Sequence, residues 1–423
     1  MAIAISSDSN ILLRTLDNGL TVALERLPFL RSATAGIWVK TGSVNEQPHE
    51  SGLAHFLEHL FFKGTTTRST HEIMKAIEGR GGHLNAFTSR EHTCLYVKML
   101  DDDIAVGIEI LADLMKNSLF LDLEKEKNVI LEEIASIEDT PDDYVHDLLA
   151  EHHWPDHPLG RPIGGTVESV SALSLDHVTS FFKNWYTPDQ MVFSVAGNIV
   201  PEVVLRQVEA EFGSVAPGPH PAIFGPPTFQ GGVNVIERDI AQDHVCLAFP
   251  ACPVGTPERH ACDLASSILG GGSTSWLFEK IREEEGLAYS IYTFTSFHQT
   301  AGMLGVYAAV APESTRQALD LTFEAFRKLR DEGVSPEELE MNRQQIKGNM
   351  LMALESTSTR MSRMAKSLLY YGRIISVDEM MANLDAVTPE QIQRFAQQSF
   401  GAQTCALTIL GPETKGRDGS INL

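Results

Sequence analysis

The sequence predicts an α+β protein of two tandem homologous domains, each a mainly antiparallel sheet with helices packed on one face. Three observations predict this fold: a repeat between the two halves, a proline- and glycine-rich segment between them, and a mixture of helical and alternating apolar patterns. The chain has 423 residues, more than the roughly 100–200 of a typical single domain, so it can form two substantial cores.

The repeat is clearest late in each half. Residues 174–198 (SLDHVTSFFKNWYTPDQMVFSVAGN) align without a gap on residues 388–412 (TPEQIQRFAQQSFGAQTCALTILGP), at an offset of 214. Each segment has the pattern of an amphipathic helix, a turn and an apolar strand. Earlier in each half, Gly19–Val22 (GLTV) matches Gly232–Val235 (GVNV) at an offset of 213. We interpret this as duplication of a unit of about 210 residues; chance similarity of amphipathic patterns is the alternative.

The segment between the halves, Ala216–Gly232, is too rich in proline and glycine for regular structure. It therefore separates the two predicted domains, and the division is 1–215, a linker at 216–232, and 233–423. Apolar periodicity within the halves predicts helices and strands, among them helices over Leu123–Ile137 and Ala318–Asp331 and a strand over Thr93–Leu100.

Composition excludes several classes of function. The net charge of −23 opposes binding to nucleic acids and to anionic membranes. The first 20 residues lack the pattern of a secretory signal, and no apolar run approaches the ~20 residues of a membrane span. The five cysteines show no zinc-knuckle spacing, which favours free thiols. We expect a cytoplasmic protein with neither nucleic acid nor membrane as partner.

A cluster of polar residues interrupts the apolar segment Gly52–Gly64 (GLAHFLEHLFFKG). On a helix, His55, Glu58 and His59 project from one face. Burying them without partners costs several kcal/mol, on the order of 2–7 for a neutral polar group. A divalent metal would compensate this cost, and H-x-x-E-H is a known zinc-binding pattern. A buried network of His–Glu hydrogen bonds is the alternative.

A third ligand is expected on the predicted helix downstream. Glu126 and Glu133 are seven residues apart and share its face, whereas Glu124 and Glu132 fit a solvated face. Spacing alone leaves the choice between Glu126 and Glu133 open.

The combined motifs resemble the pitrilysin and mitochondrial processing peptidase family of zinc peptidases, the inverzincins, and in particular its short two-domain bacterial members. The resemblance covers nearly the whole chain, and the segments that carry it are ESGLAHFLEH, GGHLNAFTSREHTCLYV, EKEKNVILEEI, HPLGRPIGGT, NWYTPDQMVFSVAGN and LGGGSTSWLFEKIREEEGLAYSI.

The resemblance implies roles for the residues of the first half. His55, His59 and Glu133 would hold one Zn²⁺ per chain, and Glu126 would support a metal-binding histidine. Glu58 would be the general base that activates the attacking water. A peptide substrate would pair with the edge of a strand beside the metal, through the contact residues Asn85, Ala86, Phe87 and Thr88. Without the resemblance, the alternative is a core Phe87 and a turn at Asn85.

The resemblance also implies that two residues of the second half act on the substrate. Arg282 would hold a carbonyl or carboxylate, and the Tyr289 hydroxyl would stabilise the oxyanion. An arginine on an exposed helix and a core tyrosine are the alternative. When residues 55–67 are aligned on residues 263–275, the positions of His55, Glu58 and His59 are occupied by Asp263, Ser266 and Ser267. These residues cannot hold zinc in the same way, so the second half is expected to bind no zinc. Leu269–Ser275 (LGGGSTS) lacks the lysine of a phosphate loop and is predicted to be a helix end and a turn.

Other histidines are predicted to lie on the surface rather than to bind metal. They are His83, His92 and the three of the proline-containing segment HHWPDHP, namely His152, His153 and His157.

By the resemblance, a closed chamber around the substrate needs four such units, so we expect a homodimer, with the linker as a hinge. The expected function is a zinc-dependent metalloendopeptidase. The alternatives are a non-catalytic structural subunit and a regulatory chain that needs a partner.

Overall fold

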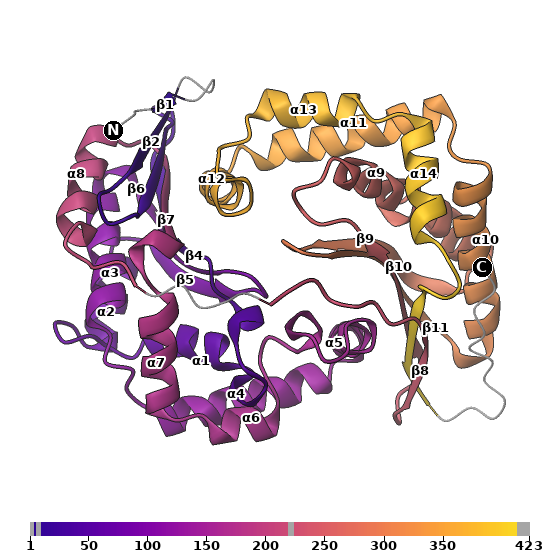
Figure 1. Cartoon of the computed structure of the whole chain (residues 1–423), viewed down its shortest axis with the longest axis horizontal. Coiled ribbons are helices and arrows are strands. Elements are labelled where there is room, and N and C mark those ends of the chain that lie inside the picture. Colours follow the sequence, from indigo (N-terminus) through magenta and orange to yellow (C-terminus); the bar gives the residue numbers. More distant parts are fainter. Residues whose placement is uncertain (1–3, 6–9, 219–223, 413–423) are drawn as a thin grey trace. The chain divides into compact units, whose positions relative to one another are not determined.

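The computed structural model describes residues 4–5, 10–218 and 224–412, and these form two compact units (Figure 1). The first unit contains the described residues of Met1–Ile134, Pro162–Phe224 and Leu351–Ser376, and the second those of Ala135–Arg161, Gly225–Met350 and Val377–Leu423. Every helix in the described part of the chain is too short or too polar to cross a lipid bilayer.

The first unit is built on a seven-stranded sheet. Its strands lie in the order β1 (Ala4–Ile5), β2 (Ile11–Thr15), β3 (Thr21–Arg26), β7 (Met191–Gly197), β4 (Ser32–Val39), β6 (Thr93–Leu100) and β5 (His83–Thr88). All neighbouring strands are antiparallel except β3 and β7. Strand β5 is therefore an edge strand of this sheet.

Helices cover both faces of this sheet. One face buries Leu24, Ile37 and Phe193 beneath the larger helix layer. That layer consists of α1 (Leu53–Phe61), α2 (Thr70–Glu78), α3 (Ile104–Asn117), the first part of α4 (Leu123–Glu138), α6 (Val167–Ala172), α7 (Leu175–Trp185) and α8 (Pro201–Phe212). On the opposite face α12 (Thr357–Tyr371) packs against Trp38 and Ala196 through Met361 and Met364.

The second unit is built on a five-stranded sheet in the order β10 (Ala288–Phe297), β11 (Gly302–Val310), β9 (Asp243–Ala251), β12 (Ala406–Gly411) and β8 (Gly232–Glu237). The core buries Leu247, Phe249 and Ile409 beneath helices on one face. The helices of this unit are the end of α4, α5 (Pro141–His153), α9 (Glu258–Gly270), α10 (Thr315–Asp331), most of α11 (Pro336–Ala353), α13 (Val377–Asp385) and α14 (Pro389–Ser399), with a π-helix at Phe278–Glu284. The predicted α+β class is confirmed. The prediction of helices on one face alone is not, because α12 from the other half of the chain covers the opposite face of the first sheet.

The strand order supports the duplication. The two series β3-β7-β4-β6-β5 and β8-β12-β9-β11-β10 arrange their strands in space in the same way relative to their order along the chain. In each series the first two strands form the single parallel pair. The pairing corrects one alignment, because Thr21 pairs with Val192 and Gly232 pairs with the equivalent Ala406. Thr21 thus corresponds to Gly232, and the match of Gly19–Val22 to Gly232–Val235 is wrong by two residues. An even slip keeps the alternation of apolar residues, which explains why sequence similarity did not detect it.

The compact units do not coincide with contiguous halves. Residues 135–161 of the first half, including α5, belong to the second unit, where α5 packs on β9 and β12. Residues 351–376 of the second half, including α12, belong to the first unit and pack on β4 and β7. Each sheet therefore receives a helix from the other half of the sequence. The division at 216–232 remains a prediction about the repeat, while the compact units are interleaved.

The predicted linker falls partly on residues 219–223, which lie outside the described residues. Residues 224–231 contain no helix or strand, as their proline content predicts. Phe229 packs on the His153 ring, with centroids 4.9 Å apart, and the Gln230 amide donates to the His153 carbonyl at 3.0 Å. This end of the predicted linker is thus anchored within the second unit, and its role as a hinge stays a prediction.

Candidate metal centre

The helix that carries the H-x-x-E-H motif is fixed at its start by two residues. Gly52 has φ of +92°, which favours glycine, and a Cβ there would lie 2.6 Å from the Gly164 carbonyl oxygen. The buried Glu46 carboxylate accepts hydrogen bonds from the backbone amides of Gly52 and Ala54, at 2.9 and 2.7 Å. It satisfies amides at the helix N-terminus, where a negative charge is favourable. Sequence reasoning missed Glu46, because it lies outside the helix.

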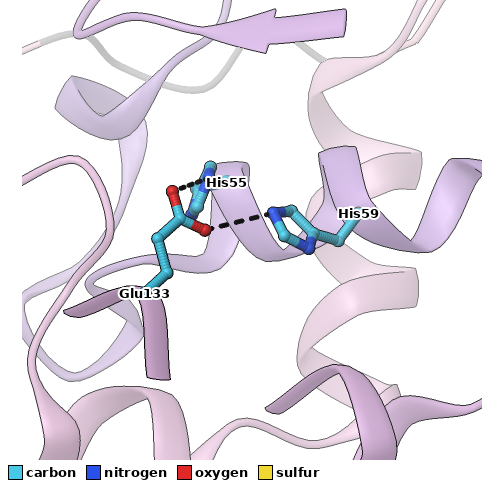
Figure 2. Close-up of side chains that lie close together, drawn as sticks. All are labelled: His55, His59 and Glu133. Atoms are coloured by element: carbon cyan, nitrogen blue, oxygen red, sulfur yellow. Dashed lines mark ion pairs between the residues drawn. The ribbon is translucent and has the colours of Figure 1, made fainter. Parts of the chain in front are cut away.

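His55, His59 and Glu133 converge as predicted. The two imidazoles project from one face of α1, with ring centroids 4.8 Å apart. Glu133 reaches them from α4: its Oε1 lies 3.7 Å from His55 Nε2 and its Oε2 lies 3.6 Å from His59 Nε2. Figure 2 shows the carboxylate between the two rings. Among the described residues, this is the one group of at least three histidine, cysteine or acidic side chains that could hold a metal ion.

The chemistry of these donors fits zinc. Zn²⁺ binds imidazole nitrogen and carboxylate oxygen at about 2.0–2.2 Å, which places tetrahedral ligands roughly 3.3–3.6 Å apart. One donor atom from each of His55, His59 and Glu133 lies within 4.8 Å of the others. Burial lowers the pKa of His55, although Glu133 opposes this, and a lowered pKa favours the neutral ring that offers a lone pair. Three protein ligands also leave a fourth position open, as catalytic zinc sites require.

Glu58 lies on the same helix, and Thr88 contacts it. The Thr88 hydroxyl donates to Glu58 Oε2 at 2.6 Å. Burial raises the pKa of Glu58, and the Thr88 hydrogen bond partly offsets the rise. The sequence predicted Thr88 only as a substrate contact and missed its bond to Glu58. That bond joins two segments 30 residues apart, so no local pattern signals it.

Glu126 lies behind His59, as the resemblance implied. Its Oε2 is 3.5 Å from His59 Nδ1, and its Oε1 is 2.7 Å from the Lys63 ammonium. Its side chain is only 3% exposed. The sequence analysis missed Lys63, which lies in the turn after the end of α1 at Phe61; its spacing of four residues from His59 is the signal that could have found it.

The residues predicted to contact a peptide lie on β5, the edge strand. Asn85 is exposed within the strand, so the alternative of a turn at this position is wrong. Ala86 is buried. Phe87 is half-buried and packs edge-to-face on Trp38, with ring centroids 5.3 Å apart. Among the described residues, β5 pairs only with β6, so its outer edge can accept another strand.

Arg282 and Tyr289 lie together within the second unit. Arg282 donates to the Tyr289 carbonyl at 2.8 Å, and its guanidinium lies 4.6 Å from the Tyr289 ring centroid. The Tyr289 side chain is exposed, so the alternative of a core tyrosine is wrong. The structure thus pairs the two residues, and their action on a substrate remains a prediction.

Two of the histidines predicted to lie on the surface are buried. His92 packs on Trp38, with centroids 5.2 Å apart, and His153 is fully buried in the last turn of α5. His152 and His153 form the end of α5, because Pro155 ends the helix only after them. Burial lowers the pKa of His153 to about 4. His83 is exposed, as expected.

The second half offers no equivalent metal site among its described residues. Asp263, Ser266 and Ser267 lie on α9, and Ser267 donates to the Asn342 side chain at 2.8 Å. Burial raises the pKa of Asp263 to about 6, and Arg259 opposes this. Helix α9 ends at Gly270 and a turn follows, which confirms the prediction for Leu269–Ser275.

Comparison with known families gives two matches along the chain. The profile described as Insulinase (Peptidase family M16) matches residues 21–167, which include the whole convergent site. The profile described as Peptidase M16 inactive domain matches residues 172–346.

Relatives match over nearly their full length. A protein of Bacillus subtilis described as the uncharacterized zinc protease YmxG is 38% identical over 400 residues, which cover 94% of this chain and 97% of the relative. An uncharacterized zinc protease of Streptomyces coelicolor is 38% identical over 408 residues, which cover 94% of this chain and 89% of the relative.

Solved structures share the fold. A peptidase M16 inactive domain from Pseudomonas fluorescens superposes with a TM-score of 0.89 at 18% identity, covering 97% of this chain and 100% of that one. A protease from Helicobacter pylori superposes with a TM-score of 0.88 at 22% identity, covering 95% of this chain and 99% of that one.

Proposed function

This chain belongs to peptidase family M16, the pitrilysin family in its bacterial form, and on that premise we propose that it is a zinc-dependent metalloendopeptidase. One observation carries the proposal: His55, His59 and Glu133 converge from two helices, and the half-buried Glu58 carboxylate lies on the same helix as the two histidines. Bound by these three residues, zinc would supply Lewis acidity for polarising the scissile carbonyl and acidifying water.

Glu58 acts as the general base in this proposal. It takes a proton from the attacking water and passes it to the leaving amine. A carboxylate whose pKa is raised by burial suits this role, because it must both accept and release the proton. The Thr88 hydroxyl restrains Oε2, so the carboxylate is held in one orientation.

The edge of β5 holds the peptide in this proposal. Main-chain pairing with a free edge tolerates many sequences, which suits peptides or unfolded segments as substrates. Arg282 and Tyr289 complete the substrate contacts, and their stacking keeps both groups ordered. We further propose a homodimer, in which two copies close a chamber around the peptide.

Metal analysis and a quenched-peptide assay on the purified chain test the proposal, with Glu58→Gln as the central variant. We expect wild type to hold one zinc per chain and cleave peptides, and Glu58→Gln to keep zinc and lose nearly all turnover. Glu132→Gln, at an exposed position one residue from Glu133, is the matched control and retains activity. If wild type holds zinc but does not cleave peptides, the result would favour a regulatory chain that needs a partner. If it neither holds zinc nor cleaves peptides, the result would favour a non-catalytic structural subunit.

A further inference from the structure

Lys63 lies at the end of a chain of charged groups that leads to a metal ligand. Its ammonium is 2.7 Å from Glu126 Oε1, while Glu126 Oε2 is 3.5 Å from His59 Nδ1. On the other side of the imidazole, His59 Nε2 is 3.6 Å from Glu133 Oε2. We propose that Lys63 is a positioning residue for zinc, acting through Glu126 on His59. This inference rests on the proposed zinc-binding function.

The first step of the argument concerns the burial of Glu126. A carboxylate that is 3% exposed is costly unless a cation or several hydrogen bonds compensate its charge. Lys63 is the one cation within ion-pair distance of Glu126 in the described part of the chain, apart from the histidine itself. It is therefore the ion-pair partner that compensates the Glu126 carboxylate in this buried position.

The second step concerns which ring nitrogen of His59 carries the proton. A carboxylate facing Nδ1 favours the tautomer with the proton on Nδ1, which leaves the lone pair on Nε2. Nε2 is the nitrogen that faces Glu133, so this tautomer is the one that binds a metal shared with Glu133. Because Lys63 occupies Oε1, Glu126 is oriented with Oε2 toward the ring.

The third step contrasts the two histidines. His55 Nδ1 is buried and has no hydrogen-bonding partner among the described residues. Of the two Nδ1 atoms, only that of His59 faces a carboxylate within ion-pair distance in the described part of the chain, and that carboxylate is the one paired with Lys63.

The experiment measures the dissociation constant of zinc by chelator competition for wild type, Lys63→Met, Glu126→Gln and the double variant. Loss of an outer partner of a metal-binding histidine weakens metal affinity by about 10–100-fold, and we expect Lys63→Met to fall in this range. Lys63→Arg, which keeps the charge, should recover most of the affinity. Lys116→Met is the control, because it removes a comparably exposed lysine paired with Glu211; its affinity should equal that of wild type.

The double variant shows whether Lys63 acts through Glu126. We expect its affinity to match that of Glu126→Gln within about twofold, since coupled residues give non-additive effects. Thermal unfolding of each metal-free variant establishes that it is folded at the assay temperature. Wild-type affinity in folded Lys63→Met, or losses that multiply in the double variant, would overturn the inference. If Lys63→Met does not fold, the test uses Lys63→Arg instead. A loss of zinc affinity in Lys63→Arg as large as that in Glu126→Gln would then overturn the inference. Absence of zinc from wild type would instead overturn the proposed function.

Discussion

The Thr88 hydroxyl donates a 2.6 Å hydrogen bond to Glu58 Oε2 and so ties the free edge of the sheet to the proposed general base. A substrate paired along β5 would thus be held by the same strand that orients Glu58. We expect Thr88→Val, which keeps the shape and removes the donor, to lower kcat by about tenfold, equivalent to roughly 1.4 kcal/mol. The zinc content should be unchanged.

Thr88→Ser is the matched variant, because it restores the hydroxyl. Peptide-cleavage kinetics and metal analysis on the three proteins check the prediction. A loss of kcat in Thr88→Ser as large as that in Thr88→Val would assign the effect to packing of the methyl group.

Glu46 is expected to stabilise the fold through α1. Its two oxygens accept from the amides of Gly52 and Ala54 in a fully buried position. Glu46→Gln replaces one acceptor by a donor and leaves a buried amide without its partner, so we expect a loss of about 1–3 kcal/mol in the free energy of unfolding.

Denaturant unfolding at neutral pH measures this loss. Glu50→Gln is the control, since Glu50 makes a similar bond to the Gln47 amide at 3.1 Å but in an exposed setting. Equal effects of the two substitutions would show that burial of Glu46 is not what makes its hydrogen bonds important.

Tyr289 is expected to contribute to turnover and little to stability, because its side chain is 82% exposed. Removing a hydroxyl that stabilises an oxyanion typically costs about 10²–10³-fold in kcat, and we expect Tyr289→Phe to approach the lower figure. The ring remains, so its stacking on Arg282 persists. Steady-state kinetics check this; a wild-type kcat in Tyr289→Phe would remove the hydroxyl from the mechanism.

Local patterns predicted much of the fold and the site. The predicted strand Thr93–Leu100 is confirmed, and the helices at Leu123–Glu138 and Thr315–Asp331 match the predictions to within a few residues. The convergence of His55 and His59 followed from helical spacing, which is fixed by backbone geometry. The choice of Glu133 needed the family resemblance, since Glu126 shares its face of the helix.

Non-local contacts could not be predicted in the same way. The bond between Thr88 and Glu58 and the capping of α1 by Glu46 depend on tertiary packing of segments that carry no shared pattern. The exchange of α5 and α12 between the two sheets is another such feature, because an amphipathic helix buries its apolar face equally well against either sheet. The sequence periodicity identifies the helix and not its partner.

His153 is expected to make stability depend on pH. Burial lowers its pKa to about 4, a shift that the Gln230 backbone opposes and His152 reinforces, while the pKa in the unfolded chain is near 6.5. Between these values the unfolded chain binds a proton that the folded protein does not, so stability falls as the pH decreases from about 6.5 to about 4. Above pH 6.5 His153 makes no pH-dependent contribution. The full loss is at most about 3–4 kcal/mol, since one pKa unit corresponds to about 1.4 kcal/mol.

Thermal unfolding of wild type and His153→Leu across this pH range isolates the effect. Leucine cannot bind a proton and suits the contact with Phe229, so the stability difference between variant and wild type should move in favour of the variant as the pH falls. His83→Gln, at an exposed position, is the control and should follow the wild-type profile. Parallel profiles for wild type and His153→Leu would mean that His153 gains its proton equally in the folded and unfolded states, and that its burial is not maintained in solution.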